Sequence, residues 1–187
     1  TRLVEEYTYG TKDIEPDPIR ARTWLKIGVE YGDALSMHNM AVLFQKEKKH
    51  TQALVLYKRA AELGIAGAQN NYGWHLYKGL GIKRNRSQAV YWIGRSADQG
   101  EPFAYGSLCE IYGAGDVFSR DDIEAMKWCR LATDKMPFGK ARDKAVVYLS
   151  KLADRMNYQQ VKEANLRVDT WQPLKQTLQL VKDSDDN

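Results

Sequence analysis

The 187 residues suffice for one domain or one repeat array with a sizeable core, and 43% of them are hydrophobic. The 28 basic and 24 acidic residues leave a formal net charge of +4, a mixed charge that suits a soluble surface better than a dedicated binder of nucleic acid. The apolar runs fall well short of the roughly 18 residues that a membrane-spanning helix needs, so we expect no membrane insertion.

Residues 1–31 are expected to form an incomplete helical unit. Because the sequence starts at Thr1, inside what resembles a degenerate first helix, we expect it to be a piece of a longer chain. Asp17 followed by Pro18 is typical of a helix start, since aspartate caps the first backbone amides and proline needs no amide partner there. The sequence therefore predicts a helix over residues 18–31.

Three two-helix units are predicted next, over residues 32–64, 65–100 and 101–136, and the middle unit shows the pattern most clearly. Its first helix includes Gly73, which costs about 1 kcal/mol of helix propensity relative to alanine. We expect a second backbone to pass close to Gly73, which would explain this cost. Gly79 can end the helix with a positive φ, and Asn85 can cap the second helix through its side-chain oxygen. In the following unit, Asp121 or Asp122 can cap the second helix in the same way.

Small and apolar residues recur at matching positions of the second helices. The spacing is 36 residues between later units and 32 residues between the first two. The matching sets are Ala21, Trp24 and Gly28; Ala53, Leu56 and Ala60; Ala89, Trp92 and Ser96; and Ala125, Trp128 and Ala132. Such a register is hard to obtain by chance and predicts stacked helical hairpins, with the three tryptophans in the core.

The units resemble the Sel1-like repeats, which differ from tetratricopeptide repeats by a longer glycine turn. The resemblance covers roughly residues 1–171 and implies an all-α fold, a right-handed α/α superhelical solenoid of TPR-like helical hairpins. The matching segments are ALVLYKRAAELG (53–64), AQNNYGWHLYKGLGI (68–82), AVYWIGRSADQG (89–100) and AYGSLCEIYGAG (104–115). Two departures affect local geometry: Cys109 stands where the preceding unit has Gly73, and the turn at 46–50 is short and lacks glycine.

The end of the chain is expected to close the array. Pro137 interrupts the helical pattern, after which two helices within 137–171 carry polar outer faces, as the end of a solenoid requires. Residues 172–187 are predicted to form a polar tail.

The histidines and cysteines do not predict catalysis or metal binding. His38, His50 and His75 have no cysteine or carboxylate at metal-ligand spacing, so we expect no metal and no cofactor. His75 aligns with leucine and isoleucine in the neighbouring units and is expected to be partly buried. Cys109 and Cys129 lie at similar height on the two helices of one hairpin; we expect two buried thiols, with a disulfide as the alternative.

Trp74 is the strongest candidate for partner binding. Its counterparts in the neighbouring units are Val42 and Glu110, a variety that indicates an exposed position. If first helices line the concave side of the solenoid, Trp74 joins Met37, His38 and Tyr105 in a mixed aromatic patch suited to a protein interface. Partial burial of Trp74 against the adjacent unit is the alternative interpretation.

We therefore predict a non-catalytic adaptor or scaffold that binds a protein or peptide on the concave face, with no nucleic acid and no small-molecule substrate. The resemblance implies a bacterial envelope, secretion or host-interaction system and a periplasmic or secreted location. One alternative is a structural segment of a larger repeat receptor or scaffold. A second, less favoured, is an envelope hydrolase that uses Glu110, Asp121 and Asp122.

Overall fold

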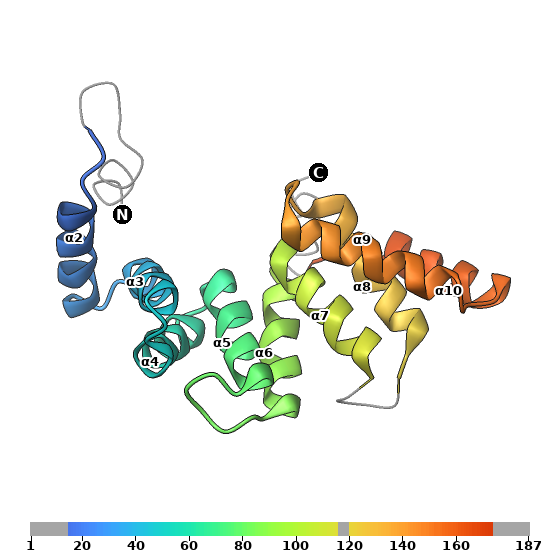
Figure 1. Ribbon diagram of the computed structural model, residues 1–187, viewed down its shortest axis with the longest axis horizontal. Coiled ribbons are helices and arrows are strands. Elements are labelled where there is room, and N and C mark those ends of the chain that lie inside the picture. The colour runs from blue at the N-terminus through green and yellow to red at the C-terminus, as the bar shows by residue number, and fades with distance from the viewer. Residues whose placement is uncertain (1–14, 116–119, 174–187) are drawn as a thin grey trace, which may run out of the picture.

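The computed structural model describes residues 15–115 and 120–173, and over these residues the chain forms α-helices and no strands. The helices are α2 (Pro18–Glu30), α3 (Ala34–Lys46), α4 (His50–Glu62), α5 (Ala66–Lys78), α6 (Arg86–Asp98), α7 (Pro102–Ala114), α8 (Asp122–Lys135), α9 (Lys140–Ala153) and α10 (Tyr158–Thr170). Figure 1 shows them following one another along a curved array, with α2 at one end and α9 and α10 at the other. None of these helices is both long and apolar enough to cross a membrane. The helix predicted within residues 1–14 and the polar tail over 174–187 lie outside the described residues.

Three helical hairpins form the array. Helix α3 packs against α4, α5 against α6, and α7 against α8, while α9 covers both α7 and α8 and α10 covers α8 (Figure 1). Alanines of the second helices are fully buried in these hairpins; Ala53, Ala89 and Ala125 have no exposed surface. These are the recurring alanines of the second helices, so the sequence register corresponds to one repeated packing position.

Short polar side chains start the helices where the sequence predicts them. A carboxylate oxygen of Asp17 accepts hydrogen bonds from the backbone N–H groups of Ile19 and Arg20, both at 3.0 Å. The side-chain oxygens of Asn85 and Asp121 accept from backbone amides three residues later, at 3.1 and 2.9 Å. These caps satisfy amides that have no partner within the helix, which is why each helix begins there.

Gly73 lies where α5 and α6 approach most closely, as predicted. A Cβ atom at this position would stand 2.6 Å from Cγ1 of Ile93 and 2.9 Å from the backbone oxygen of Ala89. Both distances are shorter than a van der Waals contact, and the second is to backbone, which cannot turn aside. The lost helix propensity at Gly73 is therefore the cost of bringing two helix backbones together.

The next hairpin has a disulfide at the equivalent place. Cys109 corresponds to Gly73 and Cys129 corresponds to Ile93, each 36 residues later. Their sulfur atoms are bonded, with the Cα atoms 4.7 Å apart. The expectation of two free thiols is therefore wrong for this structure: α7 and α8 approach so closely that the two side chains meet and form a covalent bond across the same contact.

Not all of the recurring tryptophans are in the core. Trp128 is buried and Trp92 is half-buried, but Trp24 is 39% exposed, so its predicted core position is wrong. The reason is its place in the array: α2 is the first of the described helices, and among them it packs mainly against α3.

Candidate protein-binding groove

A cavity of about 510 Å³ lies along the first helices of consecutive hairpins. We call it the first-helix groove; α5, α7 and α9 supply most of its walls, and α3 contributes Gln45. The main lining residues of the first two walls are Asn70, Asn71 and Trp74 on α5, and Phe103, Ser107 and Glu110 on α7. Residues 103, 106, 107 and 110 all line it, and this i, i+3, i+4, i+7 spacing marks one face of α7.

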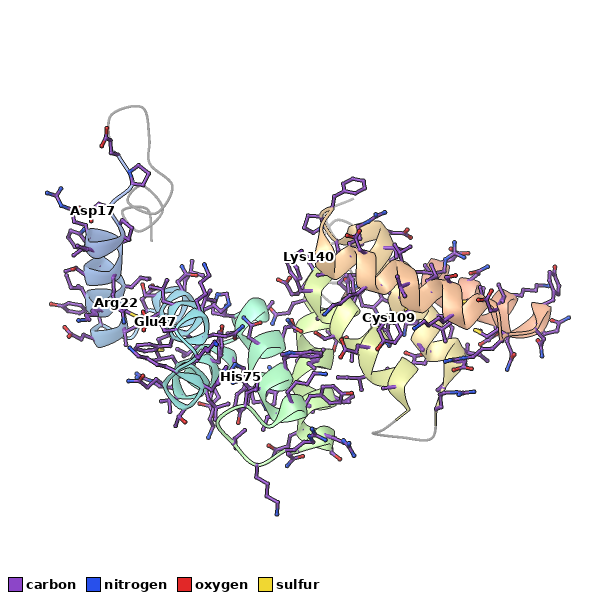
Figure 2. The ribbon with its side chains drawn as sticks, viewed as in Figure 1. Asp17, Arg22, Glu47, His75, Cys109 and Lys140 are labelled. Atoms are coloured by element: carbon purple, nitrogen blue, oxygen red, sulfur yellow. A yellow bond between two sulfur atoms is a disulfide. The ribbon has the colours of Figure 1, made fainter. Side chains whose placement is uncertain are left out.

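Helix α9 forms the third wall and brings positive charge. Lys140 and Lys144, one turn apart and exposed, line the groove together with the half-buried ring of Tyr148. Lys140, labelled in Figure 2, lies at the start of α9, the helix that packs against α7. Burial, and to a lesser extent the charge of Glu110, raises the pKa of Tyr148, in keeping with a ring held against the opposite wall. These residues could not be predicted as part of the site, because nothing in the repeat register shows that α9 lies over α7.

Trp74 is half-buried and lines the groove. The Nζ atom of Lys78 lies 4.5 Å from the centre of its indole ring and also 2.7 Å from a carboxylate oxygen of Glu110. This cation–π contact and ion pair hold the indole at the junction of α5 and α7. The exposed position and the partial burial considered for Trp74 are thus both partly correct: one part of the ring packs and the rest faces the groove.

Met37 and Tyr105 cannot belong to an exposed patch, so this part of the predicted site is wrong. Met37 is 1% exposed and Tyr105 is 2% exposed. The Tyr105 ring packs beside Trp128 and Trp171, with ring centres 5.9 and 5.2 Å apart. Both residues occupy the same repeat position as Gln69, which is also fully buried and donates from Nε2 to the carbonyl oxygen of Ala61 on α4, at 3.2 Å. This position is therefore an interior one in all three repeats.

His38 is half-buried and does not line the groove. Its Nε2 atom lies 3.2 Å from Nδ2 of Asn71, and its ring packs 5.9 Å from that of Tyr57. Of the four predicted contact residues, only Trp74 therefore reaches the groove. The three others fill the contacts between neighbouring helices.

A sequence model of the Sel1 repeat matches four segments of the chain, residues 5–32, 34–65, 66–101 and 103–135. This chain belongs to the Sel1 repeat family. The matches follow the hairpins: the third Sel1 repeat contains α5 and α6, and the fourth contains α7 and α8. The all-α solenoid and the family predicted from the sequence are thus confirmed.

Solved Sel1 structures share this fold. The chain is similar to c5321, a protective antigen of uropathogenic Escherichia coli with an SLR fold, at 26% identity and a TM-score of 0.79. The match covers 89% of this chain but 36% of c5321, so the chain spans about a third of that protein. A Sel1 repeat protein from Oxalobacter formigenes matches at 22% identity with a TM-score of 0.67, over 90% of this chain and 70% of the other.

His75 connects the third Sel1 repeat to the second and is structural, as predicted. It is fully buried; its Nδ1 lies 3.0 Å from the carbonyl oxygen of Leu80 and its Nε2 lies 3.1 Å from Oε1 of Gln45. The hydroxyl of Tyr57 donates to the same oxygen at 3.0 Å. Burial lowers the pKa of His75 below its ordinary value of 6.5; the Leu80 carbonyl opposes this shift and nearby His50 adds to it. Within the described ranges, no three His, Cys, Asp or Glu side chains are placed to hold a metal ion.

This buried imidazole should make the fold sensitive to acid. Because its pKa is lowered in the folded state, the unfolded chain binds a proton that the folded chain excludes once the pH falls below 6.5. The stabilising contribution is complete above that pH and is lost as the pH drops towards the folded-state pKa, at no more than about 1.4 kcal/mol per pH unit. We expect His75→Leu, which copies Leu43 of the second repeat, to reduce the pH dependence of the unfolding free energy in urea titrations. Equal pH dependence in the two proteins would contradict this assignment.

Proposed function

We propose that this chain is a non-catalytic adaptor or scaffold that binds a protein or peptide partner in the first-helix groove. Sel1 repeat proteins commonly mediate protein–protein contacts, and this membership supports the general role. The observation that carries the specific proposal is the partly open indole of Trp74 on the wall of a groove formed mainly by α5, α7 and α9. Aromatic side chains in such positions are favoured anchors of protein interfaces.

The acidic residues considered for a hydrolase have structural partners, which supports the non-catalytic proposal. Asp121 caps α8, and Glu110 pairs with Lys78. Asp122 accepts two hydrogen bonds from Arg155, at 2.6 and 2.8 Å, and also lies 3.2 Å from Arg120. Carboxylates fixed in this way hold helices together, and none is directed at the groove except the already paired Glu110.

Replacing Trp74 with alanine should strongly weaken partner capture while the helices remain. An interface anchor of this kind contributes 2 kcal/mol or more, so we expect affinity to fall about thirtyfold. The measurement is affinity capture with the wild-type chain and with Trp74→Ala, followed by a titration of the captured protein. Tyr158→Ala removes a 76% exposed aromatic ring on α10, outside the groove, and serves as the matched control.

Capture that Trp74→Ala leaves unchanged would overturn the groove assignment. Loss of helical circular dichroism in that variant would instead show that Trp74 acts through folding, and Phe103→Ala then tests the same groove from a residue that is 46% exposed.

A structural segment of a larger receptor or scaffold is the second candidate. It is favoured by one observation: the chain matches only 36% of c5321. A segment of this kind would stack on further repeats and would capture no partner by itself. The two bacterial neighbours, one of them a protective antigen, support placement in a bacterial envelope, secretion or host-interaction system.

A further inference from the structure

The first-helix groove has an excess of unpaired positive charge. Among the residues that the structure describes, Glu110 is the only carboxylate that lines the groove, and Lys78 pairs with it at 2.7 Å. Lys140 and Lys144 have no ion pair with any described residue. The start of α9 adds the positive end of a helix dipole at the same place. Counted over the described residues, the lining of the groove therefore has two free positive charges and no free negative charge.

The spacing of these two lysines matches an extended peptide. Residues one turn apart on a helix, such as 140 and 144, are separated by about 6 Å along its axis. Alternate side chains of an extended chain are about 6.6 Å apart and point to the same side. Two carboxylates separated by one residue can therefore meet Lys140 and Lys144 together.

The opposite wall supplies the apolar part of a peptide site. The half-buried indole of Trp74 and the exposed ring of Phe103 face the groove from α5 and α7. A ligand that satisfies both walls carries acidic side chains on one side and a large apolar side chain on the other. A basic peptide would instead bring like charges together at α9.

We propose that the first-helix groove binds an internal, extended segment of a partner protein with two Asp or Glu residues separated by one residue and a large apolar residue nearby. In this arrangement the carboxylates pair with Lys140 and Lys144, and the apolar side chain packs on Trp74. The inference rests on the proposed adaptor function and specifies the chemistry of the partner.

The test is a selection of random peptides displayed on phage against the immobilised wild-type chain. Displayed peptides are joined to the phage coat at their C-terminal end, so their carboxylates come from side chains. The selected peptides should be rich in Asp-x-Asp and related pairs next to an aromatic or large aliphatic residue. Synthetic, C-terminally amidated copies with a fluorescent label then give dissociation constants by anisotropy.

Two charge-reversed proteins provide the comparison. Lys140→Glu/Lys144→Glu should weaken binding of the selected peptides about tenfold or more, and added salt should weaken binding to wild type. Lys151→Glu/Lys162→Glu makes the same change in net charge at exposed lysines of α9 and α10 outside the groove, and should bind as wild type does. Peptides selected against the Lys140→Glu/Lys144→Glu protein should instead be rich in Lys and Arg.

The outcomes separate this inference from the adaptor proposal. Selected peptides that need Trp74 but carry no acidic preference would overturn the charge inference and leave the groove as a binding site. Synthetic copies made with a free C-terminal carboxylate should bind no more tightly than the amidated ones, and binding by the free-carboxylate copies alone would overturn the proposal of an internal segment. Failure to select any peptide that depends on Trp74 would overturn this inference, whereas the affinity capture with Trp74→Ala decides the adaptor proposal separately.

Discussion

Gly73→Ala is expected to lower the free energy of unfolding by about 2 kcal/mol, although alanine is the better helix former. The added Cβ atom would meet the backbone oxygen of Ala89 at 2.9 Å and the Ile93 side chain at 2.6 Å. Relieving these overlaps requires α5 and α6 to move apart, which loosens the packing around the fully buried Ala89. Urea unfolding followed by circular dichroism measures the change.

Gly94→Ala is the matched control. Gly94 lies in α6, and a Cβ atom there would meet nothing within 4 Å. The same substitution should therefore stabilise the protein by up to about 1 kcal/mol, the gain in helix propensity. Effects of the same sign in the two variants would contradict the close approach at Gly73.

Loss of the Cys109–Cys129 disulfide is expected to lower the free energy of unfolding by about 3 kcal/mol. The bond closes a chain segment whose ends are 20 residues apart, and breaking it frees that loop in the unfolded state. Both cysteines are buried, with exposures of 1% and 0%, so the bond is shielded from reductants while the protein is folded. Urea unfolding with and without dithiothreitol, after equilibration in the unfolded range, measures the effect.

Two double variants compare the disulfide with the noncovalent contact that the preceding repeat has at the same place. Cys109→Ala/Cys129→Ala should be less stable than the oxidised wild type by about 3 kcal/mol and should not respond to dithiothreitol. Cys109→Gly/Cys129→Ile copies the Gly73–Ile93 contact of the preceding repeat. It should be about 1 kcal/mol more stable than the alanine pair, because the isoleucine refills the buried contact. A wild-type protein that is equally stable with and without dithiothreitol would show that the bond adds nothing.

Much of the fold could be predicted because it depends on local chemistry. Helices begin at Asp17, Asn85 and Asp121, whose side-chain oxygens cap backbone amides. Aspartate and asparagine are recognisable as such caps from the sequence alone. Gly73 could be assigned to a close helix contact because glycine lowers the stability of a helix, and a close contact that excludes a Cβ atom explains why it is there. The burial of His75 followed from its aliphatic counterparts in neighbouring repeats. Each of these inferences uses only helical periodicity and the repeat register.

The candidate site was less predictable, because the repeat register does not determine which neighbouring helix packs against a given face of a helix. Met37 and Tyr105 were expected at the surface, but their repeat position is buried, and Trp171 packs on Tyr105 from the far end of the described chain. Trp24 shares a core position with Trp128, yet among the described helices α2 packs mainly against α3.

The sequence by itself determined the family, the hairpins, the caps and the close helix contact at Gly73, since all of these arise within one repeat. Only the tertiary structure decided that Cys109 and Cys129 bond and that α9 lies over α7 with Lys140 and Lys144 beside Trp74. The physical reason is the separation along the chain over which each kind of interaction acts. Capping and helical periodicity act over a few residues, whereas the groove joins side chains as far apart in the chain as Gln45 and Tyr148, which meet only when the repeats have stacked.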